Sequence, residues 1–264
     1  MITPSYKEKQ IYMKRPWQCL CRLGRQRLLG KGVINFRGKG AVNLIDVGSA
    51  GGLPHPWSEN ADKIHHLLEF EPRVKPEKNP HITTVNAALW ESNCERDFYI
   101  YKGRGGTGSS LFPQNLDYVT QNWNSLHLKG DEELANTWFE RSQLESVERI
   151  ACRRLDDVLE ELGHVFPYHF LKIDAQGAEY EIMKGAEHLL STSCLGLHLE
   201  LFVIPLYKGI TLLPEVAEYL AGFGFELARK FPPHGSFHSQ HDCLFLKKGD
   251  TSQVIDVIIK AYGI

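Results

Sequence analysis

The chain has 264 residues, of which 42% are hydrophobic and 23% charged, and its formal net charge at pH 7 is −2. This length and composition fit one α/β domain with additions, or at most two domains. The near-neutral charge does not indicate a nucleic-acid-binding protein. No apolar run approaches the roughly 20 residues of a membrane span, so we expect no transmembrane segment.

The charge is distributed unevenly along the chain. Residues 1–40 contain ten Lys or Arg residues and one acidic residue, Glu8. A basic arm of this kind can bind an anionic membrane, a nucleic acid or an acidic partner. It can also lie against the acidic remainder of its own chain, which is the arrangement we expect, with contact to an anionic surface as the alternative.

The six cysteines are scattered, and only Cys19 and Cys21 are close together, at a spacing that does not match a zinc knuckle. The other cysteines include Cys152, Cys194 and Cys243, which lie in apolar segments and are interpreted as buried thiols. Thiols that remain free indicate a reducing compartment. A signal peptide requires an apolar segment after its basic residues, and no such segment follows the basic residues at the start of this chain. We therefore expect a cytoplasmic protein.

Residues 42–47 predict a buried parallel strand that runs into a glycine-rich turn. The spacing of Gly48, Gly51 and Gly52 departs from the dinucleotide-binding fingerprint. Asp46 would also repel a pyrophosphate at the end of this strand. A cofactor with a cationic end and no phosphate, such as S-adenosylmethionine, fits the turn better. A glycine turn that binds no ligand is the alternative.

The next two apolar segments predict strands that extend the cofactor site. Residues 64–71 end in Glu71, 23 residues after Gly48, where an acid can accept both ribose hydroxyls. Residues 81–89 contain Ala87 and Ala88, whose small side chains would let an adenine ring lie close. A solvated acid and ordinary small-residue packing are the structural alternatives.

Residues 41–101 predict an alternation of strand, helix and strand, which ends in a strand over 96–101. The glycine-rich composition of residues 103–110 predicts a loop. Residues 111–147 favour short helices over core strands. We therefore expect an insertion at about 102–147, which covers a site as a lid or forms an inert surface excursion.

Strands alternate with helices again after the insertion, which predicts a doubly wound sheet. The expected helices lie at 155–159, 178–190 and 213–221, and the expected strands at 168–174, 194–203, 224–229 and 242–247.

The strongest single motif runs from Leu171 to Tyr180. A strand delivers Asp174 to the sheet edge, a turn with Gly177 follows, and a helix begins. Asp174 can hold an ammonium group, orient a substrate hydroxyl or act as a base. Helix capping near Ala175 is the structural alternative.

The sequence resembles the FkbM family of S-adenosylmethionine-dependent methyltransferases. The segments that carry the resemblance lie in the family's order, at residues 45–48, 70–72, 85–89, 154–157 and 171–180, with weaker matches at 198–201 and 242–245. The resemblance implies a class I methyltransferase fold, with a Rossmann-like sheet of seven mostly parallel strands, helices on both faces and an antiparallel last strand. It also implies methyl transfer from S-adenosylmethionine to a hydroxyl of a sugar, polysaccharide or natural-product acceptor.

The resemblance further implies roles for individual residues. It places Asp46, Gly48 and Ser49 at the methionine end of the cofactor, although the family commonly has Asn at the position of Ser49. Gly51, in the same glycine turn, is also expected to bind the cofactor. The same resemblance implies that Glu71 binds ribose and that Ala87 and Ala88 lie near adenine. Asp174 would face the reacting centre, and Ser109 with Ser110 matches a family Ser-Ser-Leu element that lines the site.

A sugar hydroxyl is a weak nucleophile at neutral pH, so a base is expected to help. We expect Asp174, Glu200 and His198 to supply the catalytic groups, and His238 and His241 are further candidates. His198 and Glu200 should share one face of their strand, as should Lys172 and Asp174. Asp174 and Glu200 with a histidine could hold a divalent cation, but no tight ligand spacing supports this and we expect no metal.

Three alternatives to this function remain. The first is an NAD-dependent oxidoreductase, which the short glycine turn and Asp46 oppose. The second is a methyltransferase fold without activity that acts as a binding module through residues 1–40. The third is a methyltransferase that acts on a nucleic-acid 2′-hydroxyl, which the acidic body does not favour.

Overall fold

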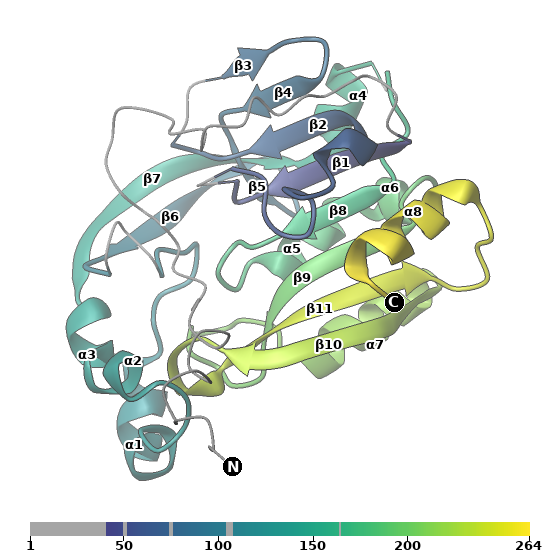
Figure 1. Cartoon of the computed structure of the whole chain (residues 1–264). Helices are drawn as coiled ribbons and strands as arrows, with labels where there is room; N and C mark the ends of the chain where they lie inside the picture. The colour runs from purple at the N-terminus through teal and green to yellow at the C-terminus, as the bar shows by residue number, and fades with distance from the viewer. Residues whose placement is uncertain (1–40, 50–51, 74–75, 104–107, 164) are drawn as a thin grey trace, which may run out of the picture.

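The computed structural model describes residues 41–49, 52–73, 76–103, 108–163 and 165–264 (Figure 1). The basic arm over residues 1–40 and the glycine Gly51 lie outside these ranges. No helix in the described part of the chain is long and apolar enough to cross a membrane.

The main sheet has eight strands in the order β10-β11-β9-β8-β1-β2-β4-β3. Their bounds are β1 (Val42–Val47), β2 (Ile64–Phe70), β3 (Glu77–Lys78), β4 (Ile82–Val85), β8 (Phe170–Ile173), β9 (Gly196–Phe202), β10 (Phe225–His234) and β11 (Gln240–Lys247). The five central strands are parallel, whereas β11 is antiparallel to both of its neighbours. The seven expected strands and the antiparallel last strand are thus present, and the short edge strand β3 is an addition.

The chain builds this sheet outward in two directions from β1. It first adds β2 and β4 on one side, and later returns to add β8 and then β9 on the other side. The order therefore reverses between β1 and β8. In open parallel sheets, a crevice for ligands forms outside the carboxyl ends of the strands at such a reversal.

Helices cover both faces of the sheet in the described chain (Figure 1). They are α4 (Leu155–Glu161), α5 (Glu179–Lys184), α6 (Glu187–Ser191), α7 (Leu213–Gly222) and α8 (Gln253–Tyr262). Successive side chains of β1 point to opposite faces. Ile45 belongs to the apolar cluster that includes Ile182 of α5 and Val216 of α7, whereas Leu44 belongs to a second cluster that includes Ile258 of α8. This alternation explains why β1 is buried along its whole length.

A second sheet carries the insertion. It contains β5 (Ala88–Trp90), β6 (Cys94–Tyr101) and β7 (Leu144–Arg154), in the order β5-β7-β6. The prediction of one strand over 81–89 was wrong, because the chain leaves the main sheet after Val85 and enters the second sheet at Ala88.

Short helices form most of the insertion, as predicted: α1 (Leu116–Leu126), α2 (Glu132–Asn136) and α3 (Trp138–Arg141). Its last part is a strand instead, since β7 begins at Leu144. The first half of β7 is exposed on both faces, so it lacks the apolar alternation by which strands are recognised.

Two helix predictions also need correction. No α-helix joins β1 to β2 in the described residues, where turns lead to a short 3-10 helix, η2 (Ala61–Lys63). Pro54 and Pro56 each remove a backbone donor from this connection. The helix expected over 178–190 is divided into α5 and α6 near Gly185, where a Cβ atom would overlap the carbonyl oxygen of Trp90. A second 3-10 helix, η4 (Ser236–His238), joins β10 to β11.

Candidate active site

The turn after β1 is packed tightly between its neighbouring strands. Gly48 has a φ of +77°, and a Cβ atom there would overlap the backbone carbonyl oxygen of Asp174. Only glycine allows both the conformation and this close approach. On the other side, the N–H groups of Gly48 and Ser49 donate to the carbonyl of Phe70 at 3.0 and 3.4 Å. The turn is therefore fixed against the ends of both β8 and β2.

Asp46 lies beneath this turn and is paired with a lysine. Its side chain is completely buried, and its Oδ1 lies 3.0 Å from Nζ of Lys172 on β8. Burial raises the pKa of Asp46, and Lys172 opposes that rise. Burial alone would lower the pKa of Lys172, but Asp46 and Asp174 raise it above its usual value. The lysine is therefore charged, and direct contact between Asp46 and a cofactor remains a prediction.

Glu71 follows β2 directly and stays partly exposed at the edge of the sheet. Burial raises the pKa of its carboxyl, and the backbone N–H of Arg73, 3.2 Å from Oε1, partly offsets that rise. The next residue, Pro72, accepts a hydrogen bond from the side chain of Asn86 at 2.7 Å. This contact holds the chain after β2 to the chain after β4.

The two alanines lie just beyond β4. Ala87 is partly buried in the link between the two sheets, and Ala88 is buried as the first residue of β5. Since β2 and β4 are parallel neighbours, Ala87 and Glu71 lie at the same edge of the sheet. Their roles toward adenine and ribose remain predictions.

Asp174 and Glu200 are brought together by one glutamine. The Gln176 side-chain amide donates hydrogen bonds to Asp174 Oδ1 at 3.1 Å and to Glu200 Oε2 at 2.7 Å. Gln240 donates to the same Glu200 oxygen at 2.5 Å. Burial raises the pKa of Glu200 well above its usual value, and the neighbouring Asp174 and Asp242 add to that rise. The two expected catalytic acids thus form one hydrogen-bonded group.

A buried acid, Glu179, fixes the turn that presents Asp174. Its Oε1 accepts the backbone N–H groups of Ala175 at 2.8 Å and Gly177 at 3.3 Å. Burial raises the pKa of Glu179 to about 8. Glu179 therefore accepts the backbone N–H groups that Asp174 would accept if Asp174 acted as a helix cap. The Asp174 carboxyl is instead hydrogen-bonded to Gln176.

His198 lies on the same face of β9 as Glu200, two residues earlier, and contacts α8. Its Nδ1 is 2.8 Å from the hydroxyl of Tyr262, and its Nε2 is 3.2 Å from Asp242 Oδ1. Asp242 also lies 3.4 Å from Nε2 of His234. Burial alone would raise the pKa of Asp242, but its hydrogen bonds with both histidines lower it. Asp242 pairs in register with Glu200, so the histidines lie next to the acid pair.

The other two candidate histidines are engaged elsewhere. His241 Nδ1 contacts the carbonyl oxygen of Phe231 at 2.7 Å. His238, in η4, packs beside Gly130 of the insertion. Among the described residues, no group of three or more His, Cys, Asp or Glu side chains is arranged to hold a metal ion.

The two serines connect the insertion to the sheet. Ser110 is buried, and its hydroxyl donates to the backbone carbonyl of Gln176 at 2.7 Å. Ser109 accepts a hydrogen bond from the backbone N–H of Tyr101 at 3.3 Å. Both hydroxyls thus make protein contacts, and contact with a cofactor remains a prediction.

The sequence reasoning did not single out several residues of this group. The hydroxyl of Tyr207 donates to the Gly108 carbonyl at 2.8 Å and also lies 3.3 Å from Gln176 Oε1. Tyr207, His234 and Gln240 carry no local signal, because only the folded sheet brings them near Asp174. For Gln176, the signal was available: it lies two residues after Asp174, in the turn of the strongest motif.

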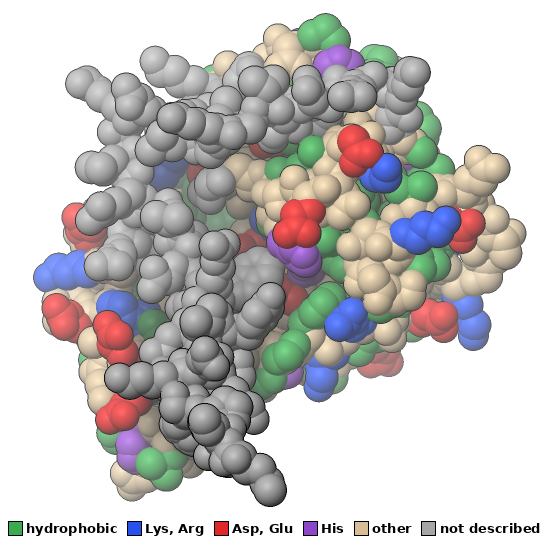
Figure 2. All heavy atoms as spheres, viewed as in Figure 1, with side chains coloured by type: hydrophobic (Ala, Val, Ile, Leu, Met, Phe, Trp, Pro, Cys, Tyr) green, Lys and Arg blue, Asp and Glu red, His purple; other side chains and the backbone are tan. Residues whose placement is uncertain are grey.

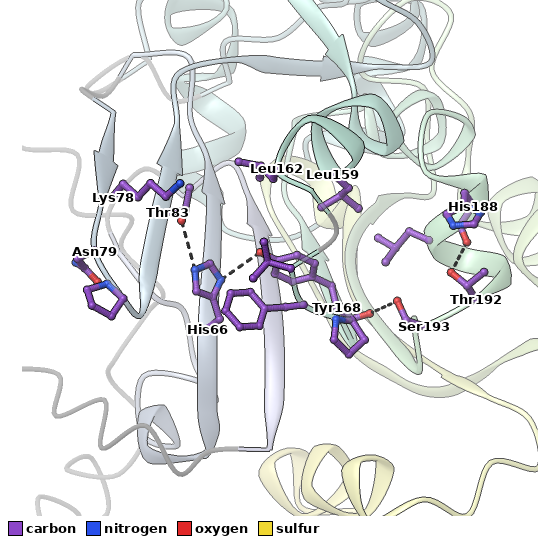
Figure 3. A pocket seen from close by; sticks show the side chains of 15 residues that line it. His66, Lys78, Asn79, Thr83, Leu159, Leu162, Tyr168, His188, Thr192 and Ser193 are labelled. Carbon is purple, nitrogen blue, oxygen red and sulfur yellow. Dashed lines mark hydrogen bonds between the residues drawn. The ribbon is translucent and has the colours of Figure 1, made fainter.

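A separate cavity of about 580 Å³ lies at the opposite end of the sheet (Figure 3). It contains none of the predicted site residues. His66 faces it, with ring nitrogens 3.3 Å from the Thr83 hydroxyl and 3.1 Å from the Tyr168 hydroxyl. Burial lowers the pKa of His66 to about 4. A neutral histidine satisfied by two hydroxyls fits a structural role.

Comparison with known proteins agrees with the family suggested by the motifs. The family described as "Methyltransferase FkbM domain" matches residues 46–227. A crystal structure of methyltransferase FkbM from Methylobacillus flagellatus KT is similar, with 13% identity and a TM-score of 0.41, over 78% of this chain and 43% of that chain. This chain thus spans less than half the length of that protein. No curated protein matches the sequence. Because the family match covers more than half of the chain, the chain belongs to the FkbM methyltransferase family.

Proposed function

We propose that the chain is an S-adenosylmethionine-dependent methyltransferase with the class I fold, and that it methylates a hydroxyl of a sugar, polysaccharide or natural-product acceptor. One observation carries the proposal. The Gly48 turn, Glu71 and Asp174 follow the neighbouring strands β1, β2 and β8, at the point where the strand order reverses. Cofactors bind at this position in open parallel sheets.

The donor groups of the turn favour a cofactor without phosphate. A pyrophosphate needs free backbone N–H groups, but those of Gly48 and Ser49 both donate to Phe70. The side chains at the edge are instead acids, Glu71 and Asp174. Glu71 would accept hydrogen bonds from the ribose hydroxyls, and Asp174 would attract the ammonium group. This chemistry fits S-adenosylmethionine better than a dinucleotide.

The cofactor would supply an electrophilic methyl group carried on a sulfonium. The protein must then align the acceptor hydroxyl with this methyl group and take up its proton. Asp174 is partly exposed and lies beside the turn, where it would hold the ammonium group, so a second acid close to Asp174 would take up the proton. Glu200 is linked to Asp174 through Gln176. His198 lies two residues before Glu200 on β9 and contacts Asp242, which pairs in register with Glu200.

The insertion at 102–147 would cover the acceptor as a lid. It is attached beside Asp174, because Ser110 and Tyr207 connect residues 108–110 to Gln176. A neutral acceptor also fits the charge distribution. On the part of the described surface that is visible in Figure 2, acidic and basic side chains are interspersed.

Calorimetric titration of the whole chain with S-adenosylmethionine, S-adenosylhomocysteine and NAD tests the cofactor. We expect both adenosyl ligands to bind and NAD not to bind. Binding of NAD alone would favour an oxidoreductase. A folded protein that binds none of the three would favour a binding module that acts through residues 1–40.

A second assay identifies the acceptor. Transfer of a radiolabelled methyl group from S-adenosylmethionine is measured with a panel of methyl glycosides, a polysaccharide and an RNA oligonucleotide. We expect label on a carbohydrate and its loss in Asp174→Asn. Label on RNA alone would contradict the acceptor class but not the transfer reaction.

A further inference from the structure

Lys172 connects the two strands that flank the candidate cofactor site. It lies on β8, directly opposite Asp46 of β1 in the sheet register. Its Nζ lies 3.0 Å from Asp46 Oδ1 and 3.4 Å from each of the carbonyl oxygens of Val47 and Gly48. An ammonium group has three donors. The ammonium of Lys172 thus donates hydrogen bonds to two carbonyl oxygens and forms an ion pair with one carboxylate oxygen, all at the end of β1.

This pairing withdraws Asp46 from a ligand. The Asp46 side chain has 0% exposure and that of Lys172 has 11%. Breaking a buried pair by removing one partner leaves an uncompensated charge, which is strongly unfavourable. A cofactor ammonium could reach Asp46 only if the surrounding residues moved, because no part of the Asp46 side chain is exposed. Direct recognition of the cofactor by Asp46 is thus opposed by the structure of the turn itself.

The same pairing fixes the turn from its carbonyl side. Lys172 binds the carbonyls of Val47 and Gly48, while the Phe70 carbonyl binds the N–H groups of Gly48 and Ser49. The peptide groups around Gly48 are thus held from both sides.

Asp174 is the acid that remains available beside the fixed turn. It follows Lys172 by two residues and lies directly after β8, its carbonyl packs on Gly48, and it is partly exposed. We propose that Lys172 is a positioning residue for the amino-acid end of the cofactor: it neutralises Asp46 and holds the turn, so that Asp174 receives the ammonium group. This inference rests on the proposed function.

Two ligands separate this role from a general effect on folding. S-adenosylhomocysteine carries the amino-acid end, whereas 5′-methylthioadenosine contains the nucleoside without it. Both are titrated by calorimetry into the wild-type chain and into Lys172→Met. We expect the variant to bind S-adenosylhomocysteine at least about tenfold more weakly, and to bind 5′-methylthioadenosine within about twofold of wild type. Asp174→Asn should show the same selective loss.

Two further variants control for folding. Lys247→Met removes another lysine that binds two carbonyls, those of Leu190 at 2.9 Å and Phe223 at 2.8 Å, away from the site, and it should leave both affinities unchanged. If Lys172→Met does not fold, Asp46→Asn combined with Lys172→Met removes both buried charges. This double variant should fold and should show the same selective loss, because the turn is no longer held.

The outcomes separate the two proposals. If wild type binds S-adenosylhomocysteine and Lys172→Met, or the double variant, binds it equally well, the inference about Lys172 is wrong and the proposed function stands. Equal losses for both ligands would show a merely structural lysine and would also overturn the inference. A wild-type chain that binds neither ligand would overturn the proposed function, and the inference with it.

Discussion

Gln176 donates a hydrogen bond to Glu200 at 2.7 Å from a left-handed backbone conformation, with a φ of +51°. A non-glycine residue in this conformation costs roughly 1–2 kcal/mol, so its surroundings must hold it there. They do so through Ser110, which binds the Gln176 carbonyl, and Glu179, which binds the backbone on either side of Gln176. Strained residues held in this way cluster at functional sites.

Ser110→Ala tests the connection between the insertion and this turn. It removes the buried donor to the Gln176 carbonyl, so we expect the free energy of unfolding to fall by about 1–3 kcal/mol. Hydrogen exchange should also become faster in residues 108–113. Urea denaturation and exchange mass spectrometry measure the two effects. Ser109→Ala is the matched control, because the Ser109 hydroxyl makes one longer contact, at 3.3 Å. If Ser109→Ala lowered the free energy of unfolding as much as Ser110→Ala, the connection through Ser110 would be refuted.

Gly48→Ala tests the close approach of β1 and β8. The new methyl group would overlap the Asp174 carbonyl oxygen in addition to the cost of a left-handed alanine. We expect a loss of stability well beyond the roughly 1–2 kcal/mol of the backbone conformation alone, measured by thermal denaturation. Gly52→Ala is the control, because Gly52 has a φ of +90° but no atom within 4 Å of the added Cβ. Equal losses in the two variants would contradict this packing.

Glu71→Ala tests the ribose site. The carboxyl is partly exposed and accepts one backbone N–H, so its loss should change the melting temperature little. We expect the affinity for S-adenosylhomocysteine and for 5′-methylthioadenosine to fall by about tenfold or more, since both contain the ribose. Calorimetry measures both affinities, with Glu226→Ala as an exposed control on β10. Unchanged binding of both ligands would mean that Glu71 does not face the cofactor.

Glu179→Gln tests the buried acid under the turn through its pH dependence. The Glu179 pKa is about 8 in the folded state and about 4.5 in the unfolded chain. Between these values, the folded state keeps a proton that the unfolded state releases, so wild type should lose stability as pH rises. The glutamine variant does not lose stability in this way. Its free energy of unfolding relative to wild type should therefore increase by at most about 1.4 kcal/mol per pH unit.

Below the unfolded-state pKa, both states carry the proton and the difference should become constant. Urea denaturation at about pH 5 and about pH 8 measures this trend, with Glu226→Gln as the exposed comparison. A difference between wild type and Glu179→Gln that does not change with pH would contradict the raised pKa.

The sequence predicted the parts of the fold in which pattern and burial agree. The run of apolar residues 42–47 marks β1 because both of its faces are covered. The polar half of β7 was missed for the opposite reason, since its exposed side chains leave only backbone pairing with β6 to define it. The break after Val85 was also missed, because residues on both sides of it are strand residues and only the change of sheet separates them.

Some features of the candidate site could likewise be predicted from the sequence, whereas others depend on how the strands pair. Glu71 and Asp174 each directly follow a strand, so their place at one edge of the sheet follows from the order of the elements. The pairing of Asp46 with Lys172 does not, because it requires knowing that β1 and β8 are neighbours and in which register. His234 comes from β10 and meets Asp242 only through the antiparallel pairing of the last two strands.

The second sheet has a consequence for how this protein can diversify. The insertion leaves the domain along β6 and returns along β7, and these strands pair from Cys94 with Cys152 to Tyr101 with Leu144. This two-stranded stem fixes both ends of the insertion in the second sheet, outside the sheet that contains β1. Loops and helices beyond the stem can therefore lengthen, shorten or change composition while the glycine turn stays in register. Under the proposed function, such changes would alter which acceptor is bound while the strand ends that would hold the cofactor stay unchanged.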